Sequence, residues 1–97
     1  MTAAFKQRRA ARNPHAYIIG TADHNGARLL VKVASMGRHN HMWLSAGRTR
    51  VVQCDTDKGG ERAALDAMLS AVGATLTAID ARAIGHNGAT VRNLRQF

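Results

Sequence analysis

Cysteine, proline, aromatic residues and acidic residues are all scarce in this chain of 97 residues. Cys54 is the only cysteine, which excludes an intramolecular disulfide and a cysteine-rich zinc module. The sequence contains one Trp, one Tyr and two Phe, so it lacks the paired aromatic residues with which RNA-recognition motifs stack on bases. Any recognition of nucleic acid is therefore expected to depend on phosphate contacts.

Long apolar runs are absent as well, since no stretch approaches the ~18 residues of a membrane span. The first 12 residues contain four cations and no apolar segment of the kind that a secretory signal needs. We therefore expect a cytoplasmic protein with no membrane partner. The length allows one domain, and the apolar fraction of 45%, much of it Ala, predicts a small core.

Positive charge is what the sequence has in excess. Fourteen Lys and Arg stand against six Asp and Glu, which gives a formal net charge of +8. A field of this sign attracts phosphate backbones and acidic protein surfaces. Most of the cations are Arg, whose planar guanidinium can hold a phosphate or a carboxylate at two oxygens. The composition therefore indicates a polyanionic partner.

The residue pattern divides the chain into a basic N-terminal arm, 1–14, and a single α+β domain, 15–97. We expect the arm to lie outside the core and to become ordered only on binding or packing, so its removal should leave the thermal transition nearly unchanged. In the domain, the pattern predicts a small antiparallel sheet, a four-stranded meander plus one or two C-terminal strands, covered by one main helix. The expected strands are 16–21, 28–34, 41–45, 49–54, 75–79 and 90–94.

Two Asn-Gly dipeptides, at 25–26 and 87–88, supply the positive φ values that tight hairpin turns require. Both follow a histidine, and we attribute this recurrence to turn chemistry because the surrounding residues do not match. In the strand 28–34, alternation places Arg28 and Lys32 on one face of the sheet. The opposite face carries apolar residues that we assign to the core: Leu29, Val31 and Val33.

The predicted helix runs from 57 to 72. Thr56 or Asp57 can cap its start, and Gly73 is well placed to end it. Its apolar residues recur at the spacing of one helical face and complete the predicted core. They are Leu65, Met68, Leu69 and Val72.

Histidines suggest two kinds of chemistry that the sequence does not complete. His39 and His41 share one face of a strand and could provide two metal ligands, but nothing in the spacing points to a third. We therefore predict no metal and no cofactor. Histidines could also act as acid and base in RNA cleavage, with Arg48 or Arg50 stabilising the phosphorane, although the sequence marks no adjacent pair.

Trp43 lies among cationic residues in the sequence, and two interpretations stay open for it. Its indole can stack on a base, or it can fill the core of a small sheet. We include it among the candidate binding residues for nucleic acid or another partner. These are Lys6, Arg8, Arg9, Arg12, Arg28, Lys32, Arg38, His39, His41, Trp43, Arg48 and Arg50.

The leading interpretation is a small basic protein that binds DNA or RNA through Arg-rich contacts to the phosphate backbone and is not an enzyme. One alternative is a small inhibitor or adaptor, of the kind that phages and mobile elements encode, which binds an acidic protein surface or a nucleoprotein defence complex. A second alternative is a histidine-dependent ribonuclease. A homodimer is compatible with so small a core.

Overall fold

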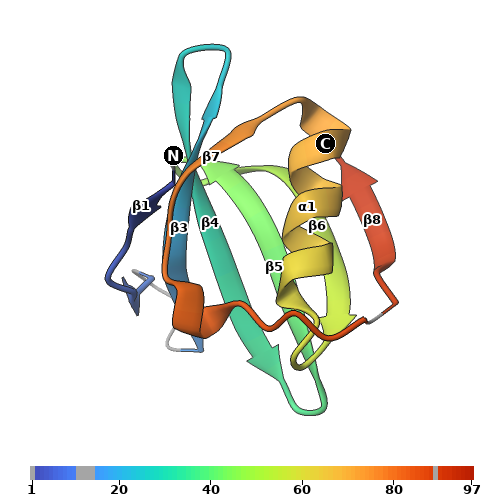
Figure 1. Cartoon of the computed structure of the whole chain (residues 1–97). Coiled ribbons are helices and arrows are strands. Elements are labelled where there is room, and N and C mark those ends of the chain that lie inside the picture. The colour runs from blue at the N-terminus through green and yellow to red at the C-terminus, as the bar shows by residue number, and fades with distance from the viewer. Residues whose placement is uncertain (1, 11–14, 89) are drawn as a thin grey trace.

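The computed structural model describes residues 2–10, 15–88 and 90–97, which form one sheet of eight strands with one α-helix against it (Figure 1). The predicted α+β class, with a mainly antiparallel sheet and one helix, is confirmed. In chain order the elements are β1 (Ala3–Ala4), β2 (Arg8–Arg9), β3 (Ala16–His24), β4 (Ala27–Met36), β5 (His39–Ala46), β6 (Thr49–Asp57), α1 (Glu61–Val72), β7 (Thr75–Ile79), the 3-10 helix η1 (Ala81–Ala83) and β8 (Arg92–Gln96).

The strands lie in the order β1-β7-β3-β4-β5-β6-β8, and β2 also pairs with β3. Strands β3 to β6 follow one another in the chain and are antiparallel neighbours in the sheet. The other edge of β3 is shared, because β2 pairs with Tyr17 and Ile18 whereas β7 pairs with residues 20–23. Strand β1 is parallel to β7, and β8 is antiparallel to β6. Segments from both ends of the chain thus extend a central four-strand arrangement.

The turn between β3 and β4 forms where the sequence predicts it. Asn25 and Gly26 have φ values of 54° and 84°, as a two-residue hairpin turn of this kind requires. The next two hairpins turn at Gly37 and Gly47, which also have positive φ values. Short turns therefore keep β3 to β6 adjacent.

The second predicted turn, at Asn87-Gly88, is wrong. A hairpin there would need the strands on either side to pair, but β7 pairs with β3 while β8 pairs with β6. The intervening residues 84–88 instead form an irregular segment beside the start of α1. The amide of Asn87 donates to the carbonyl oxygen of Gly59 at 2.9 Å.

The predicted start of the helix is also wrong by one turn. Strand β6 continues to Asp57, which pairs with His39, so α1 begins only at Glu61. Gly60 occupies the N-cap position and no side chain caps it, while Thr56 is buried and bonds to the carbonyl of Gly60. The predicted end is confirmed, because Gly73 adopts the left-handed conformation with φ 71°.

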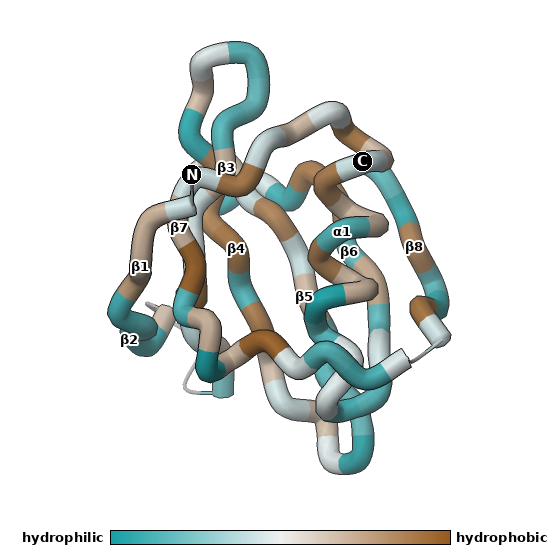
Figure 2. Tube along the Cα trace, viewed as in Figure 1, coloured by the Kyte–Doolittle hydropathy of each residue, from teal (hydrophilic) through white to brown (hydrophobic). Residues whose placement is uncertain are grey.

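Alternation along the strands separates two apolar clusters on the two faces of the sheet. In β4, hydrophobic and hydrophilic residues alternate along part of the strand (Figure 2). In β5, Met42 and Leu44 face the helix, whereas Trp43 points to the opposite face. We call this second side the helix-free face of the sheet.

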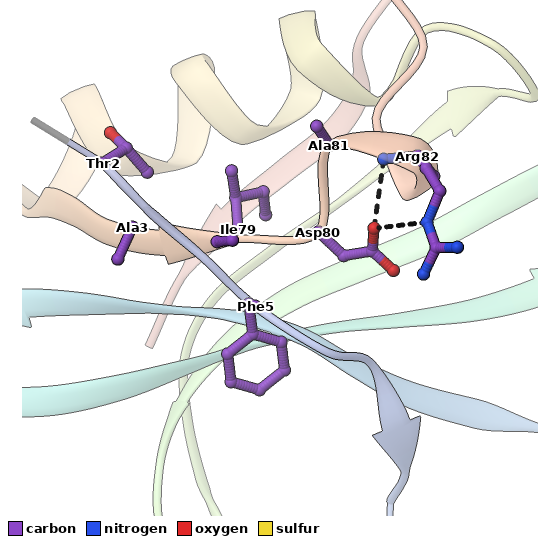
Figure 3. A pocket seen from close by; sticks show the side chains of 8 residues that line it. Thr2, Ala3, Phe5, Ile79, Asp80, Ala81 and Arg82 are labelled. Atoms are coloured by element: carbon purple, nitrogen blue, oxygen red, sulfur yellow. Dashed lines mark hydrogen bonds and ion pairs between the residues drawn. The ribbon is translucent and has the colours of Figure 1, made fainter.

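The described part of the N-terminal segment belongs to the sheet and does not form a separate arm. Strand β1 lies beside the end of β7, and the amide of Phe5 donates to the carbonyl of Ile79 at 3.1 Å (Figure 3). Phe5 and the buried Ala10 pack into the apolar cluster of the helix-free face. The described residues 2–10 therefore pack against the sheet, and the predicted separation of a basic arm from the core is not confirmed.

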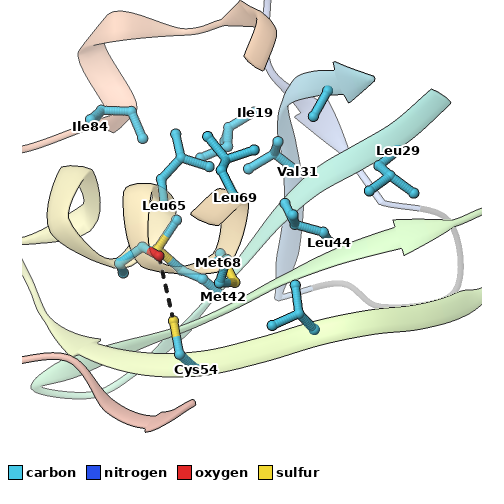
Figure 4. Close-up of a cluster of buried hydrophobic side chains, with 13 residues drawn as sticks. Ile19, Leu29, Val31, Met42, Leu44, Cys54, Leu65, Met68, Leu69 and Ile84 are labelled. Atoms are coloured by element: carbon cyan, nitrogen blue, oxygen red, sulfur yellow. Dashed lines mark hydrogen bonds between the residues drawn. The ribbon is translucent and has the colours of Figure 1, made fainter. Parts of the chain in front are cut away.

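The main core lies between α1 and the sheet (Figure 4). Of the predicted core residues, Val33 and Val72 are partly buried and the others are buried. Cys54 is fully buried in this core. Its burial is the main cause that raises the pKa of the thiol to about 11, and the negative charge of Asp55 is the smaller cause. Within the described ranges, no helix is long and apolar enough to span a membrane.

Candidate functional site

The helix-free face carries a row of mainly polar side chains that crosses the sheet from β2 to β8. Strand register places the members of this row side by side, one from each strand. Successive residues of a strand point to opposite faces, so these partners share the face that Trp43 occupies. The row consists of Arg8, Ile18, Lys32, Trp43, Gln53 and Arg95.

The neighbouring row contains an ion pair at its centre. It consists of Ala16, Ala34, His41, Asp55 and Arg92 in adjacent strands. Nδ1 of His41 lies 2.7 Å from Oδ1 of Asp55, and both side chains are 21% exposed. The side chain of Asn93 donates to the other oxygen of Asp55 at 2.9 Å. Both oxygens of this carboxylate therefore have partners.

Arg50 joins the two rows. Its Nη1 lies 2.6 Å from Nε2 of His41 and donates to Oε1 of Gln53 at 2.8 Å. Its guanidinium carbon lies 4.2 Å from the centre of the Trp43 ring, within the range of a cation–π contact. The rings of His41 and Trp43 are 5.4 Å apart. We call this group of contacting residues the His41 cluster. Its members are His41, Trp43, Arg50, Gln53, Asp55 and Asn93.

The carboxylate of Asp55 is held in its ionised form. Burial pushes its pKa upward, but hydrogen bonds from Asn93 and His41 and the electrostatic influence of His41 and His39 together outweigh the effect of burial. The pKa of Asp55 consequently lies below its ordinary value. An ionised Asp55 fixes the orientation of the His41 ring and favours a proton on Nδ1.

Trp43 is 6% exposed and packs with Ile18 and Ala34. Of the two interpretations of this residue, core packing is therefore the one that the structure supports. The indole is too buried to stack on a base, but its face positions Arg50. A hydrophobic residue thus orients a cation at the surface.

Several cations of the helix-free face have no acidic partner. Among the described residues, ion pairs involve His41, Arg62, Arg82 and Arg92. No carboxylate of the described ranges is within ion-pairing distance of the following four cations, which we call the open cations: Arg8, Lys32, Arg50 and Arg95. An external anion can therefore pair with them without displacing a carboxylate of the described residues.

The remaining candidate cations lie around the margins of the sheet. Arg38 and Arg48 occupy the turns at opposite ends of β5, and Arg28 lies near the β3–β4 turn. Lys6 lies between β1 and β2, and the Arg9 guanidinium lies 5.9 Å from the ring of Tyr17. His39 begins β5 and shares the helix-free face. Arg12 lies outside the described residues.

The structure therefore brings together only part of the predicted site. It places Arg8, Lys32, His41 and Arg50 on one face and leaves the turn cations apart. The sequence-based prediction does not include Arg95 or three members of the His41 cluster, Gln53, Asp55 and Asn93. One signal is present for Gln53, which falls in the predicted strand 49–54. Asp55 lies just beyond that predicted strand, because β6 continues to Asp57.

The other histidines do not assemble a metal site. Within the described ranges, no group of three or more His, Cys, Asp or Glu is placed to hold a metal ion. His24 ends β3, and the exposed His86 lies in the irregular segment after η1. These two residues of the repeated His-Asn-Gly sequence thus occupy different kinds of structure.

A hollow of about 450 Å³ lies between the N-terminal segment and the end of β7 (Figure 3). Most of its lining residues are apolar or small, and they are Thr2, Ala3, Ala4, Phe5, Ile79, Asp80, Ala81 and Arg82. Asp80 is 4% exposed and already binds Arg82, through the backbone amide at 3.1 Å and Nε at 3.3 Å. The carboxylate of Asp80 in its wall disfavours an anionic ligand. The hollow therefore differs in its chemistry from the cationic helix-free face.

Comparison of the chain with protein-family models, with curated proteins and with solved structures found no match.

Proposed function

We propose that this protein binds nucleic acid through contacts between the phosphate backbone and the helix-free face of its sheet, without catalysing a reaction. The observation that supports this most is the set of open cations, Arg8, Lys32, Arg50 and Arg95. Four strands hold these residues in fixed register on one face, and none has a carboxylate partner among the described residues. Cations arranged across a surface in this way suit a chain of phosphates.

Phosphate contacts are what the open cations of this surface offer. Its one Trp is buried, so no exposed indole is available for stacking on bases. The open cations are guanidinium and ammonium groups, which bind phosphate oxygens irrespective of sequence. We therefore expect weak sequence preference and strong dependence on salt.

The test is a binding series with labelled DNA and RNA at increasing salt concentration. Removal of one open cation that binds a phosphate should reduce the slope of log affinity against log salt by about 1. The double variant Lys32→Gln/Arg95→Gln should therefore bind more weakly and show a shallower slope. Circular dichroism should show that its fold is kept.

The matched control is Arg62→Gln/Arg82→Gln, which removes the same charge from two arginines that already pair with Asp66 and Asp80. We expect this control to retain nearly the original affinity and slope. Equal reductions of affinity in the two double variants would show that net charge, and not the helix-free face, determines binding. If neither DNA nor RNA is bound at low salt, an acidic protein surface replaces nucleic acid as the proposed partner.

The ribonuclease alternative has one observation in its favour, because Asp55 orients His41 as a carboxylate orients a catalytic base. However, the Nε2 lone pair that would accept the substrate proton is already bonded to Arg50. We therefore expect RNA to stay intact on incubation with the purified protein. Cleavage that disappears in His41→Ala would replace the binding proposal with the catalytic one.

A further inference from the structure

The contact between His41 and Arg50 defines the protonation state of the imidazole. Arginine keeps its charge and can only donate hydrogen bonds. Nη1 of Arg50 lies 2.6 Å from Nε2 of His41, so Nε2 must be the acceptor and carry no proton. The ring proton is then on Nδ1, where it is donated to Asp55 at 2.7 Å. The observed geometry is that of a neutral imidazole.

Protonation of His41 changes this contact from attractive to repulsive. Nε2 would then present a hydrogen to the Arg50 guanidinium, so that two donors and two positive charges face each other. An anion between them removes the conflict, because one of its oxygens can accept from Nε2 and another from Arg50. Gln53 and the Trp43 ring hold Arg50 close enough to take part in such an arrangement.

We propose that His41 and Arg50 form a binding site for a phosphodiester group of nucleic acid, and that this site takes its ligand when His41 is protonated. The proposal rests on the proposed function and names the phosphate position within it. Asp55 stabilises the imidazolium from the other side, so the bound state has the order carboxylate, imidazolium, phosphate. Arg50 supplies the second donor to the phosphate.

The charged groups near His41 are compatible with phosphate binding to the protonated ring. Strand β6 contributes Asp55 and Arg50, and β8 contributes Arg92, which pairs with Asp57 at 3.1 Å. On β4, Ala34 is the direct register partner of His41, and Lys32 lies in the neighbouring row. His39 lies two residues away on the same strand. Among the described residues, one carboxylate, Asp55, contacts the imidazole at Nδ1, and one cation, Arg50, contacts it at Nε2.

The sign of the pH effect follows from linkage. A ligand that binds the protonated form more tightly loses affinity as pH rises through the range in which histidines titrate, ~5 to 8. Replacing a charge-assisted hydrogen bond by none should weaken binding about tenfold. The wild-type protein should therefore bind a labelled single-stranded oligonucleotide about tenfold more tightly at about pH 5.5 than at about pH 8, at constant ionic strength.

Two variants distinguish the contribution of His41 to the pH dependence of binding from that of the other histidines. His41→Gln should remove most of the pH dependence, whereas His86→Gln, which alters an exposed histidine in the segment 84–88, should retain it. Thermal melting of each variant should establish that the comparison is made between folded proteins. Equal pH dependence in the wild type and in His41→Gln would overturn the proposal.

A second readout does not require nucleic acid to bind. In a nitrogen-detected NMR titration, inorganic phosphate should shift the Nε2 resonance of His41 and raise the pH at which it titrates, because the anion stabilises the protonated ring. If phosphate does this while no oligonucleotide binds, the proposed function fails and the phosphate site stands. If the oligonucleotide binds while phosphate leaves the His41 titration unchanged, the site is wrong and the proposed function stands.

Discussion

Glu61 is 5% exposed, and its carboxylate accepts hydrogen bonds from three separate parts of the chain. Oε2 accepts from the amide of Gly59 at 2.7 Å and from the side chain of Asn40 at 3.0 Å, and Oε1 accepts from the amide of Gly85 at 2.8 Å. This one residue therefore ties the start of α1 to β5 and to the segment after η1. Its position at the helix N-terminus further favours a negative charge.

Replacement of Glu61 should strongly destabilise the protein. Glu61→Ala leaves two backbone amides and one side-chain amide without their acceptor, which we expect to cost about 3 kcal/mol of unfolding free energy. For a chain of this length the corresponding fall in Tm is roughly 15 °C. Thermal unfolding should compare the Tm of Glu61→Ala with that of Asp66→Ala, which replaces an exposed acidic residue of the same helix. Similar Tm values for the two variants would contradict this role for Glu61.

At the scale of elements, the sequence predicts the turns and helix ends whose conformation is set by residues adjacent in the chain. The turn at Asn25-Gly26 forms because the dipeptide itself supplies the backbone angles, and α1 ends at Gly73 for the same reason. The start of α1 was misplaced because Asp57 pairs with His39 across the sheet, a contact that local propensity does not contain. The turn expected at Asn87-Gly88 fails because its flanking strands pair elsewhere in the sheet.

The N-terminal segment provides the element-scale prediction. Deletion of residues 1–10 removes β1 and β2 and uncovers the cluster around Trp43. We expect the deletion to cost about 2 kcal/mol and to lower Tm by roughly 10 °C, contrary to the sequence-based expectation of little change. Trp43 fluorescence should shift to longer wavelength as the indole meets water. An unchanged Tm and emission maximum would mean that this segment does not cover the helix-free face.

At the scale of the whole molecule, the open cations share one face of the sheet. The sequence predicts the net charge of +8 and identifies Lys32, His41 and Arg50 as individual candidates. It does not predict that β8 adds Arg95 to the same row, or that Asp55 lies opposite His41. The first fact depends on pairing between β6 and β8, which are far apart in the chain. The second depends on the register of the β5–β6 hairpin, which shifts between Leu44 and Ser45 and which composition and spacing do not encode.

The most direct test of the proposed interface is an amide-resolved NMR titration of the labelled protein with a short single-stranded oligonucleotide at low salt. The proposal predicts that the largest shifts occur at the helix-free face, around Lys32, His41, Arg50 and Arg95. The exposed side of α1, around Arg62 and Asp66, should change little. Shifts concentrated on α1, or no shifts at all, would contradict nucleic-acid binding by the helix-free face.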